Sequence, residues 1–109
     1  MTGLFDVRSA QKNGALLIEV SGEVDGAVEM QFVESVVDNV RTTEAARVVL
    51  DLSRVEFMDS TGLRMLLVCQ RRAEDRGIPL TLAMASSSPV SRLIDVSGVA
   101  AMFQYEPLD

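Results

Sequence analysis

The residues with the clearest capacity for chemistry are Asp59, Ser60 and Thr61, which stand in a row before Gly62. A carboxylate and two hydroxyls lie there just ahead of Leu63, from which leucines recur at helical spacing. Ser60 or one of its neighbours is therefore expected to cap a helix, where backbone N–H groups lack partners within the helix. A hydroxyl in that position is exposed, so we expect the chemistry of the protein at this point of the chain.

The sequence gives little support for catalysis at Ser60. It contains no histidine, which excludes a Ser-His or Cys-His pair, and its only lysine, Lys12, is distant in a turn. No glycine-rich nucleotide-binding motif occurs. A single cysteine, Cys69, can form neither an internal disulfide nor a zinc site, and is expected to be buried. We therefore expect no enzymatic activity, no catalytic residue, no metal and no cofactor.

The sequence from Asp59 to Gly62 also bears a partial likeness to the Asp-Thr/Ser-Gly motif of aspartic proteases. Here an extra residue separates the Asp from the Gly. The run that follows has helical spacing, whereas the protease motif belongs to an all-β fold. This reading is set aside.

The charge balance opposes binding to nucleic acids or anionic membranes. The formal net charge is −6, from 10 basic and 16 acidic residues, and phosphate contacts need a clustered basic face. The basic residues Arg71 and Arg72 are diluted by Glu74 and Asp75, as on a solvated helix face. No window approaches the roughly 18 apolar residues of a membrane span, and the N-terminal residues lack a signal-peptide pattern. A cytoplasmic protein is expected.

At 109 residues the chain is expected to form a single domain, residues 1–109. Its patterns predict the order β-β-α-β-α-β-α-β, with an antiparallel hairpin at Asn13-Gly14 and parallel strands joined by helices. The fold class is α/β, with a mixed four- to five-stranded sheet, an antiparallel edge hairpin and about three packing helices. The expected strands are 4–8, 15–20, 47–52, 78–85 and 101–105, and the expected helices are 27–43, 61–76 and 89–98.

The first helix is expected to bury one valine face. Val33, Val36, Val37 and Val40 fall at i, i+3, i+4 and i+7, and Asp25 is the candidate N-cap.

The remaining breaks in the pattern come from polar and glycine residues. Residues 21–26 and 53–54 are expected to end strands. Ser88 is expected to cap the last helix ahead of Pro89, and Gly77 and Gly98 to end helices.

The chain resembles STAS domains, specifically the bacterial anti-anti-sigma factors (anti-sigma factor antagonists). The resemblance keeps the family's order and spacing over nearly the whole chain, and its motifs are specific only jointly. The matching residues are Ser21-Gly22-Glu23-Val24-Asp25, Val48 to Leu52, Phe57-Met58-Asp59-Ser60-Thr61-Gly62-Leu63, Ser88-Pro89, Arg92-Leu93 and Ser97-Gly98. Two features depart from the family pattern: Arg64 stands where a Gly is common, and the sequence ends at residues 107–109, where the family often has an extra helix.

The resemblance implies a regulatory binding protein. In the family, the hydroxyl directly after the Asp is phosphorylated by the partner anti-sigma factor, a serine kinase with a GHKL-type ATP-binding fold. A phosphatase is expected to restore the active form. The corresponding residue is Ser60, with Thr61 as a minor candidate. The region around Asp25 joins the family's partner surface, so the expected partner-binding residues are Asp25, Asp59, Ser60, Thr61 and Arg64.

Two other readings stay open at this point. The chain could be a STAS scaffold subunit of a stress-signalling complex or of a membrane transporter, using the same surface without gating a sigma factor. It could also be a structural domain in which Ser60 is a helix cap only. In that case Ser60→Ala would cost about 0.5–2 kcal/mol of stability.

Overall fold

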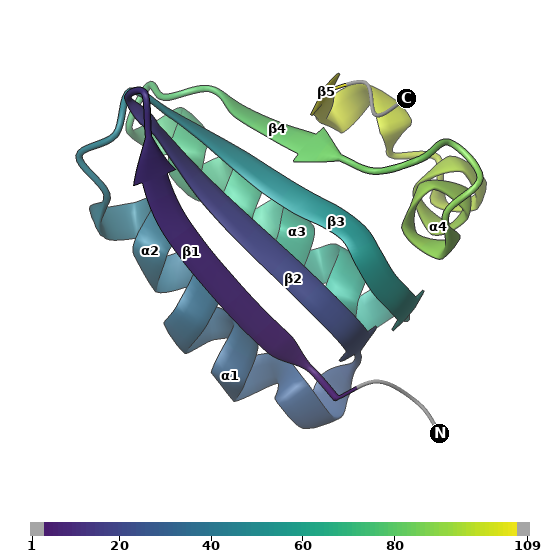
Figure 1. Ribbon diagram of the computed structural model, residues 1–109. Coiled ribbons are helices and arrows are strands. Elements are labelled where there is room, and N and C mark those ends of the chain that lie inside the picture. The colour runs from purple at the N-terminus through teal and green to yellow at the C-terminus, as the bar shows by residue number, and fades with distance from the viewer. Residues whose placement is uncertain (1–3, 107–109) are drawn as a thin grey trace.

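The computed structural model describes residues 4–106, whose strands form one mixed sheet in the order β1-β2-β3-β4-β5 (Figure 1). β1 and β2 pair antiparallel, and the other neighbours pair parallel. The strands are β1 (Asp6–Lys12), β2 (Ala15–Val24), β3 (Arg47–Met58), β4 (Leu80–Ala83) and β5 (Gln104–Glu106). The α/β class, the edge hairpin and the order of elements expected from the sequence are confirmed.

Helices α1, α2 and α3 lie behind the strands β1, β2 and β3 in Figure 1. Because α1, η2 and α2 are continuous, residues 4–106 contain three longer helical segments, as expected. Within β3, only residues 48–51 pair with β4, and α4 packs beside the part of β3 that extends further (Figure 1). The helical elements are η1 (Gly26–Val28), α1 (Glu29–Phe32), the π-helical η2 (Val33–Val37), α2 (Asp38–Thr42), α3 (Ser60–Asp75), α4 (Pro89–Ser97) and η3 (Ala100–Met102).

The hairpin turns at Asn13 and Gly14, whose φ angles of 53° and 79° are both positive. Two such residues form the tight turn that matches the twist of antiparallel strands. Pairing then runs without a break from Lys12 opposite Ala15 to Asp6 opposite Ser21. The first strand therefore lies at Asp6–Lys12, nearer the turn than the expected residues 4–8.

β2 and β3 are longer than expected, and the two predicted strand ends are wrong. β2 continues to Val24 through a glycine, Gly22, at φ 88°, and its pairing with β3 shifts register twice. β3 continues to Met58, while Asp51 accepts hydrogen bonds from the backbone and hydroxyl of Ser53. These irregularities absorb the polar residues, because a bulge bends a strand without ending it.

The core is aliphatic and lies between the sheet and the helices. Phe32, Val36, Val37 and Val40 are buried, but Val33 is 38% exposed, so its predicted place on the core face is wrong. The cause is η2, because a π-helical turn holds more residues than an α-helical turn and rotates the later residues less. The buried stripe therefore begins at Phe32 instead of Val33.

The last strands are short. β4 covers Leu80–Ala83 of the expected 78–85, and β5 begins only at Gln104, because Ala100–Met102 form a 3-10 turn. The chain end at residues 107–109, like residues 1–3, lies outside the described part. Cys69 is buried, as expected.

Candidate functional site

The carboxyl ends of β2 and β3 meet at one edge of the sheet. Val24 pairs with Met58 in the parallel ladder, and the N–H of Asp59 donates to the carbonyl of Val24 at 3.3 Å. Asp25 and Asp59 each follow one of these paired residues. Both aspartates are half-buried, and each directly precedes the first residue of a helical turn. Two helix starts therefore lie side by side at this edge.

Asp59 caps α3. Its backbone is extended (φ −108°), its Oδ1 accepts the N–H of Gly62 at 3.1 Å, and its carbonyl accepts the N–H of Leu63 at 3.0 Å. Ser60 is therefore the first helical residue. The N-cap is therefore its neighbour Asp59. The negative carboxylate of Asp59 also interacts favourably with the positive end of the helix dipole. The reading of Ser60 as a cap only is thus corrected.

The hydroxyl of Ser60 is free. The side chain is exposed, and no group among residues 4–106 forms a hydrogen bond with it. The backbone N–H groups of Ser60 and Thr61 lie in the first turn, where a helix offers no acceptor. A free hydroxyl thus stands beside two N–H donors at the positive end of α3.

Asp25 caps the neighbouring turn η1, as predicted. Its Oδ1 accepts the N–H of Ala27 at 3.0 Å, and its carbonyl accepts the N–H of Val28 at 3.2 Å. Thr61, half-buried, faces this turn: a β-carbon placed on Gly26 would lie 3.9 Å from Thr61 Oγ1. The first turns of η1 and α3 are therefore in contact range.

Gly62 permits this close arrangement. A β-carbon at Gly62 would lie 2.5 Å from Met58 Cγ and 2.9 Å from the carbonyl oxygen of Val24. The second distance is to backbone, which cannot move aside as a flexible side chain can. Any larger residue would push α3 away from the strand ends, and Ser60 with it.

Arg64 lies one turn after Ser60 on the same face of α3. Its Nη2 forms an ion pair with Glu29 Oε2 at 3.2 Å, and both side chains are well exposed. The pair joins α3 to α1 across the sequence. Glu29 was not predicted from the sequence, since nothing local to it signals a partner 35 residues away.

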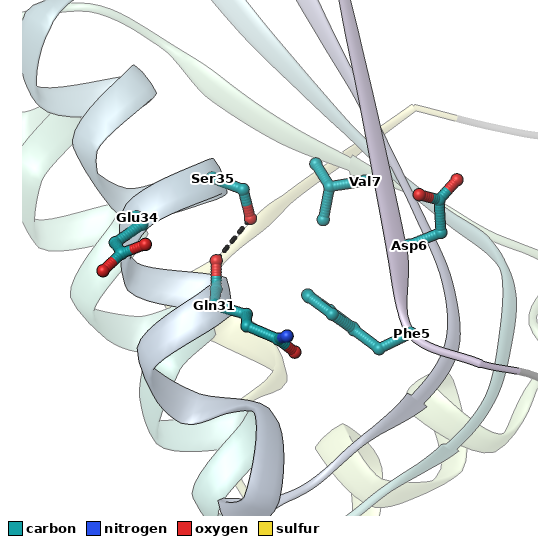
Figure 2. Close-up of a pocket in the computed structure, with 6 residues that line it drawn as sticks. All are labelled: Phe5, Asp6, Val7, Gln31, Glu34 and Ser35. Atoms are coloured by element: carbon teal, nitrogen blue, oxygen red, sulfur yellow. Dashed lines mark hydrogen bonds between the residues drawn. The ribbon is translucent and has the colours of Figure 1, made fainter.

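A hollow lies between β1 and the first helix and does not include the residues around Ser60. Figure 2 shows its lining, in which Ser35 Oγ donates to the carbonyl of Gln31 at 2.5 Å. The volume is about 370 Å³. The lining residues are Phe5, Asp6, Val7, Gln31, Glu34 and Ser35. The hydroxyl of Ser35 already donates its proton to Gln31, so the surface around Ser60 remains the stronger candidate.

Two observations on residues 4–106 concern metal ligands and membrane-spanning helices. No group of three or more His, Cys, Asp or Glu side chains there could hold a metal ion. No helix in the same range has the length and apolar character needed to cross a membrane.

Comparisons with known proteins give the family. The family model described as "Mlab, STAS domain" matches residues 7–104. An anti-sigma F factor antagonist of Paenibacillus polymyxa is 31% identical over an alignment of 99 residues, and the match covers 87% of this chain and 80% of that protein.

Solved structures show the same fold. The anti-sigma factor antagonist SpoIIAA in its unphosphorylated form gives a TM-score of 0.74 at 19% identity, covering 97% of this chain and 89% of that one. The Bacillus cell fate determinant SpoIIAA in its phosphorylated form gives 0.69 at 20% identity, covering 97% and 92%. With its five-stranded mixed sheet, edge hairpin and matching motifs, the chain belongs to the STAS domain family and, within it, to the anti-sigma factor antagonists.

Proposed function

We propose that this protein is a binding switch controlled by phosphorylation of Ser60. Unmodified, the surface of Asp25, Asp59, Ser60, Thr61 and Arg64 binds an anti-sigma factor serine kinase of the GHKL type and releases the sigma factor. Phosphorylation by that kinase ends the binding, and a phosphatase restores it. Ser60 is the main acceptor, because Thr61 is half-buried against η1.

The observation that carries the proposal is the free, exposed hydroxyl of Ser60 at the first position of α3. A kinase needs a hydroxyl that it can reach and that no structural hydrogen bond occupies. The neighbour Asp59 supplies the cap, so modification of Ser60 removes no bond that holds the helix. SpoIIAA, which shares the fold, has been solved in a phosphorylated form, and this supports a similar modification here.

Phosphate on Ser60 should change binding more than stability. It adds about −1.5 to −2 charges at pH 7, at a helix end whose dipole and free N–H groups favour an anion. The carboxylate of Asp59 lies next to it and repels a second negative group. A docked partner would have to desolvate this charge, which is costly when no cation pairs with it, so the complex should dissociate while the fold persists.

The test is a pull-down from the native host with the full chain as bait. Ser60→Ala represents the unmodified state and Ser60→Asp approximates the phosphorylated one. Ser97→Asp is the matched control, since Ser97 is also an exposed helical serine but is the last residue of a different helix, α4. Bound proteins are identified by mass spectrometry, and melting curves verify that every bait is folded.

The proposal expects an ATP-binding anti-sigma factor on the Ser60→Ala and Ser97→Asp baits and none on Ser60→Asp. Equal retention of one non-kinase partner on all three baits would replace the switch with the scaffold function. Unfolding of the domain on phosphorylation would also contradict the mechanism, because the binding loss would then follow from lost structure.

A further inference from the structure

A hollow of about 440 Å³ adjoins the proposed switch surface, over η1, α1 and the start of η2. Its apolar part is unusually open to solvent, since Met30 is 76% exposed and Val33 is 38% exposed. Large apolar side chains exposed together often mark an interaction surface. The lining residues are Gly26, Ala27, Glu29, Met30, Val33 and Glu34.

The hollow shares residues with the contacts that organise the switch surface. Gly26, in its lining, lies opposite Thr61, since a β-carbon added to Gly26 would be 3.9 Å from Thr61 Oγ1. Glu29, also in the lining, is the ion-pair partner of Arg64. A partner that covers Ser60 and Arg64 therefore reaches the hollow without a gap.

The charge of the rim indicates what such a partner presents. Both ionisable residues of the lining, Glu29 and Glu34, are acidic. Glu29 is paired with Arg64, while Glu34 forms no ion pair or hydrogen bond through its carboxylate within residues 4–106. An apolar floor with an acidic rim is complementary to an apolar side chain flanked by basic residues.

We propose that this hollow receives an apolar side chain of the anti-sigma factor kinase, presented beside a basic residue that approaches Glu34. The inference rests on the proposed function and extends it to a second part of the interface. Ser60 does not line the hollow, so phosphate there acts on the neighbouring contacts. The hollow supplies affinity, and Ser60 supplies the control.

The size of the effect follows from Met30. Most of its side chain is available to be covered, and burying a methionine side chain is worth enough free energy to change affinity by about tenfold or more. The same exposure means that the folded domain gains little from Met30, so replacing it should leave the melting temperature unchanged.

The experiment measures the affinity of purified variants for the kinase that the Ser60→Ala bait identifies, by calorimetry with nucleotide present. Met30→Ser is expected to weaken binding about tenfold or more. Met102→Ser is the matched control, since Met102 is 56% exposed in η3 and lines no part of the hollow. Glu34→Gln is expected to weaken binding at low salt and to reduce the salt dependence, because one attractive charge pair is lost.

The outcomes separate the two proposals. If Ser60→Asp binds the kinase as well as Ser60→Ala does, the switch itself fails, whatever Met30→Ser does. If Ser60→Asp loses binding but Met30→Ser and Met102→Ser both bind like the unaltered chain, the hollow lies outside the interface and only this inference fails. A variant whose melting temperature falls is replaced by Met30→Gln, which keeps the length of the side chain and removes its apolar end.

Discussion

The starts of α3 and α4 use the same capping bond with different residues. At α4, Ser88 is the N-cap: its Oγ accepts the N–H of Ser91 at 3.1 Å, and Pro89 follows at the first helical position. At α3, the cap is Asp59, and the first helical position holds Ser60. In each helix the cap satisfies one of the N-terminal N–H groups, but only α3 carries a hydroxyl at its first helical position.

The difference shows how one position decides whether a serine is structural or available. A serine at the N-cap commits its oxygen to the backbone, so a modification there would cost the helix its cap. A serine one residue later makes no such bond and can gain a phosphate that the helix end favours. Ser60 and Ser88 therefore form an internal pair for testing the switch.

The largest expected effect is selective phosphorylation. With the kinase and ATP, phosphate should appear on Ser60 and not on Ser88, since only the Ser60 hydroxyl is exposed and unbonded. Peptide mapping by mass spectrometry locates the phosphate, and Ser60→Ala should reduce its incorporation by about a hundredfold or more. Incorporation that persists in Ser60→Ala on Thr61 would move the acceptor by one residue, and phosphate on Ser88 would remove the distinction between the two helix starts.

The next effect concerns how close α3 lies to the strand ends. Gly62→Ala should destabilise the fold by about 1–3 kcal/mol in urea unfolding, because the new methyl group overpacks against backbone. Gly26→Ala is the control, since its β-carbon would meet only an ordinary contact at 3.9 Å. Equal stability of the two variants would show that α3 can shift without cost and that its position does not depend on Gly62.

A smaller effect separates the caps from the free serine. Ser88→Ala and Asp59→Ala should each lower the free energy of unfolding by about 0.5–2 kcal/mol, through loss of a cap. Ser60→Ala should stay within about 0.5 kcal/mol of the unaltered chain, as for an exposed side chain without structural bonds. A loss at Ser60 as large as that at Ser88 would mean that Ser60 does cap α3 in solution.

The smallest expected effect concerns the buried thiol of Cys69 in α3. Burial raises the pKa of the Cys69 thiol from 9.0 to about 12. The unfolded chain therefore loses this proton first as the pH rises, and stability falls between pH 9 and 12. From about pH 7 to about pH 9.5 the loss due to Cys69 should be under about 1 kcal/mol, seen as a steeper decline in urea-unfolding free energy than in Cys69→Ala. Identical pH profiles for the two proteins would indicate that the Cys69 thiol has the same pKa in the folded and unfolded chain, and would contradict this prediction.

Local chemistry made part of the site predictable from the sequence. The caps at Asp25 and Ser88 were expected because a capping side chain reaches a backbone group only two or three residues away. The glycine ends of α3 and α4 were expected for the same reason, and Gly77 and Gly98 indeed have φ angles of 68° and 74°. The hairpin at Asn13 needed only its own two residues.

What the sequence could not predict depends on pairing between distant residues. The polar residues near Ser21 and Ser53 look like strand ends, and only the register shifts between β2 and β3 keep both strands going to Val24 and Met58. Asp59 is the cap because it keeps an extended backbone and pairs with Val24 of β2, so that the helix begins only at Ser60. The ion pair between Glu29 and Arg64 exists because two helices pack side by side.

The wide turn at η2 fixes the phase of the first helix relative to the sheet. Met30 before the turn and Val33 at its first position are exposed, whereas Val36 near its end and Val40 after it are buried. Deleting one residue within the turn would restore an α-helical phase and bring Val33 back toward the core, which would remove an apolar wall of the hollow beside Ser60. The hollow is therefore encoded by the length of this segment as well as by its side chains, and an insertion or deletion could create or abolish it without any substitution.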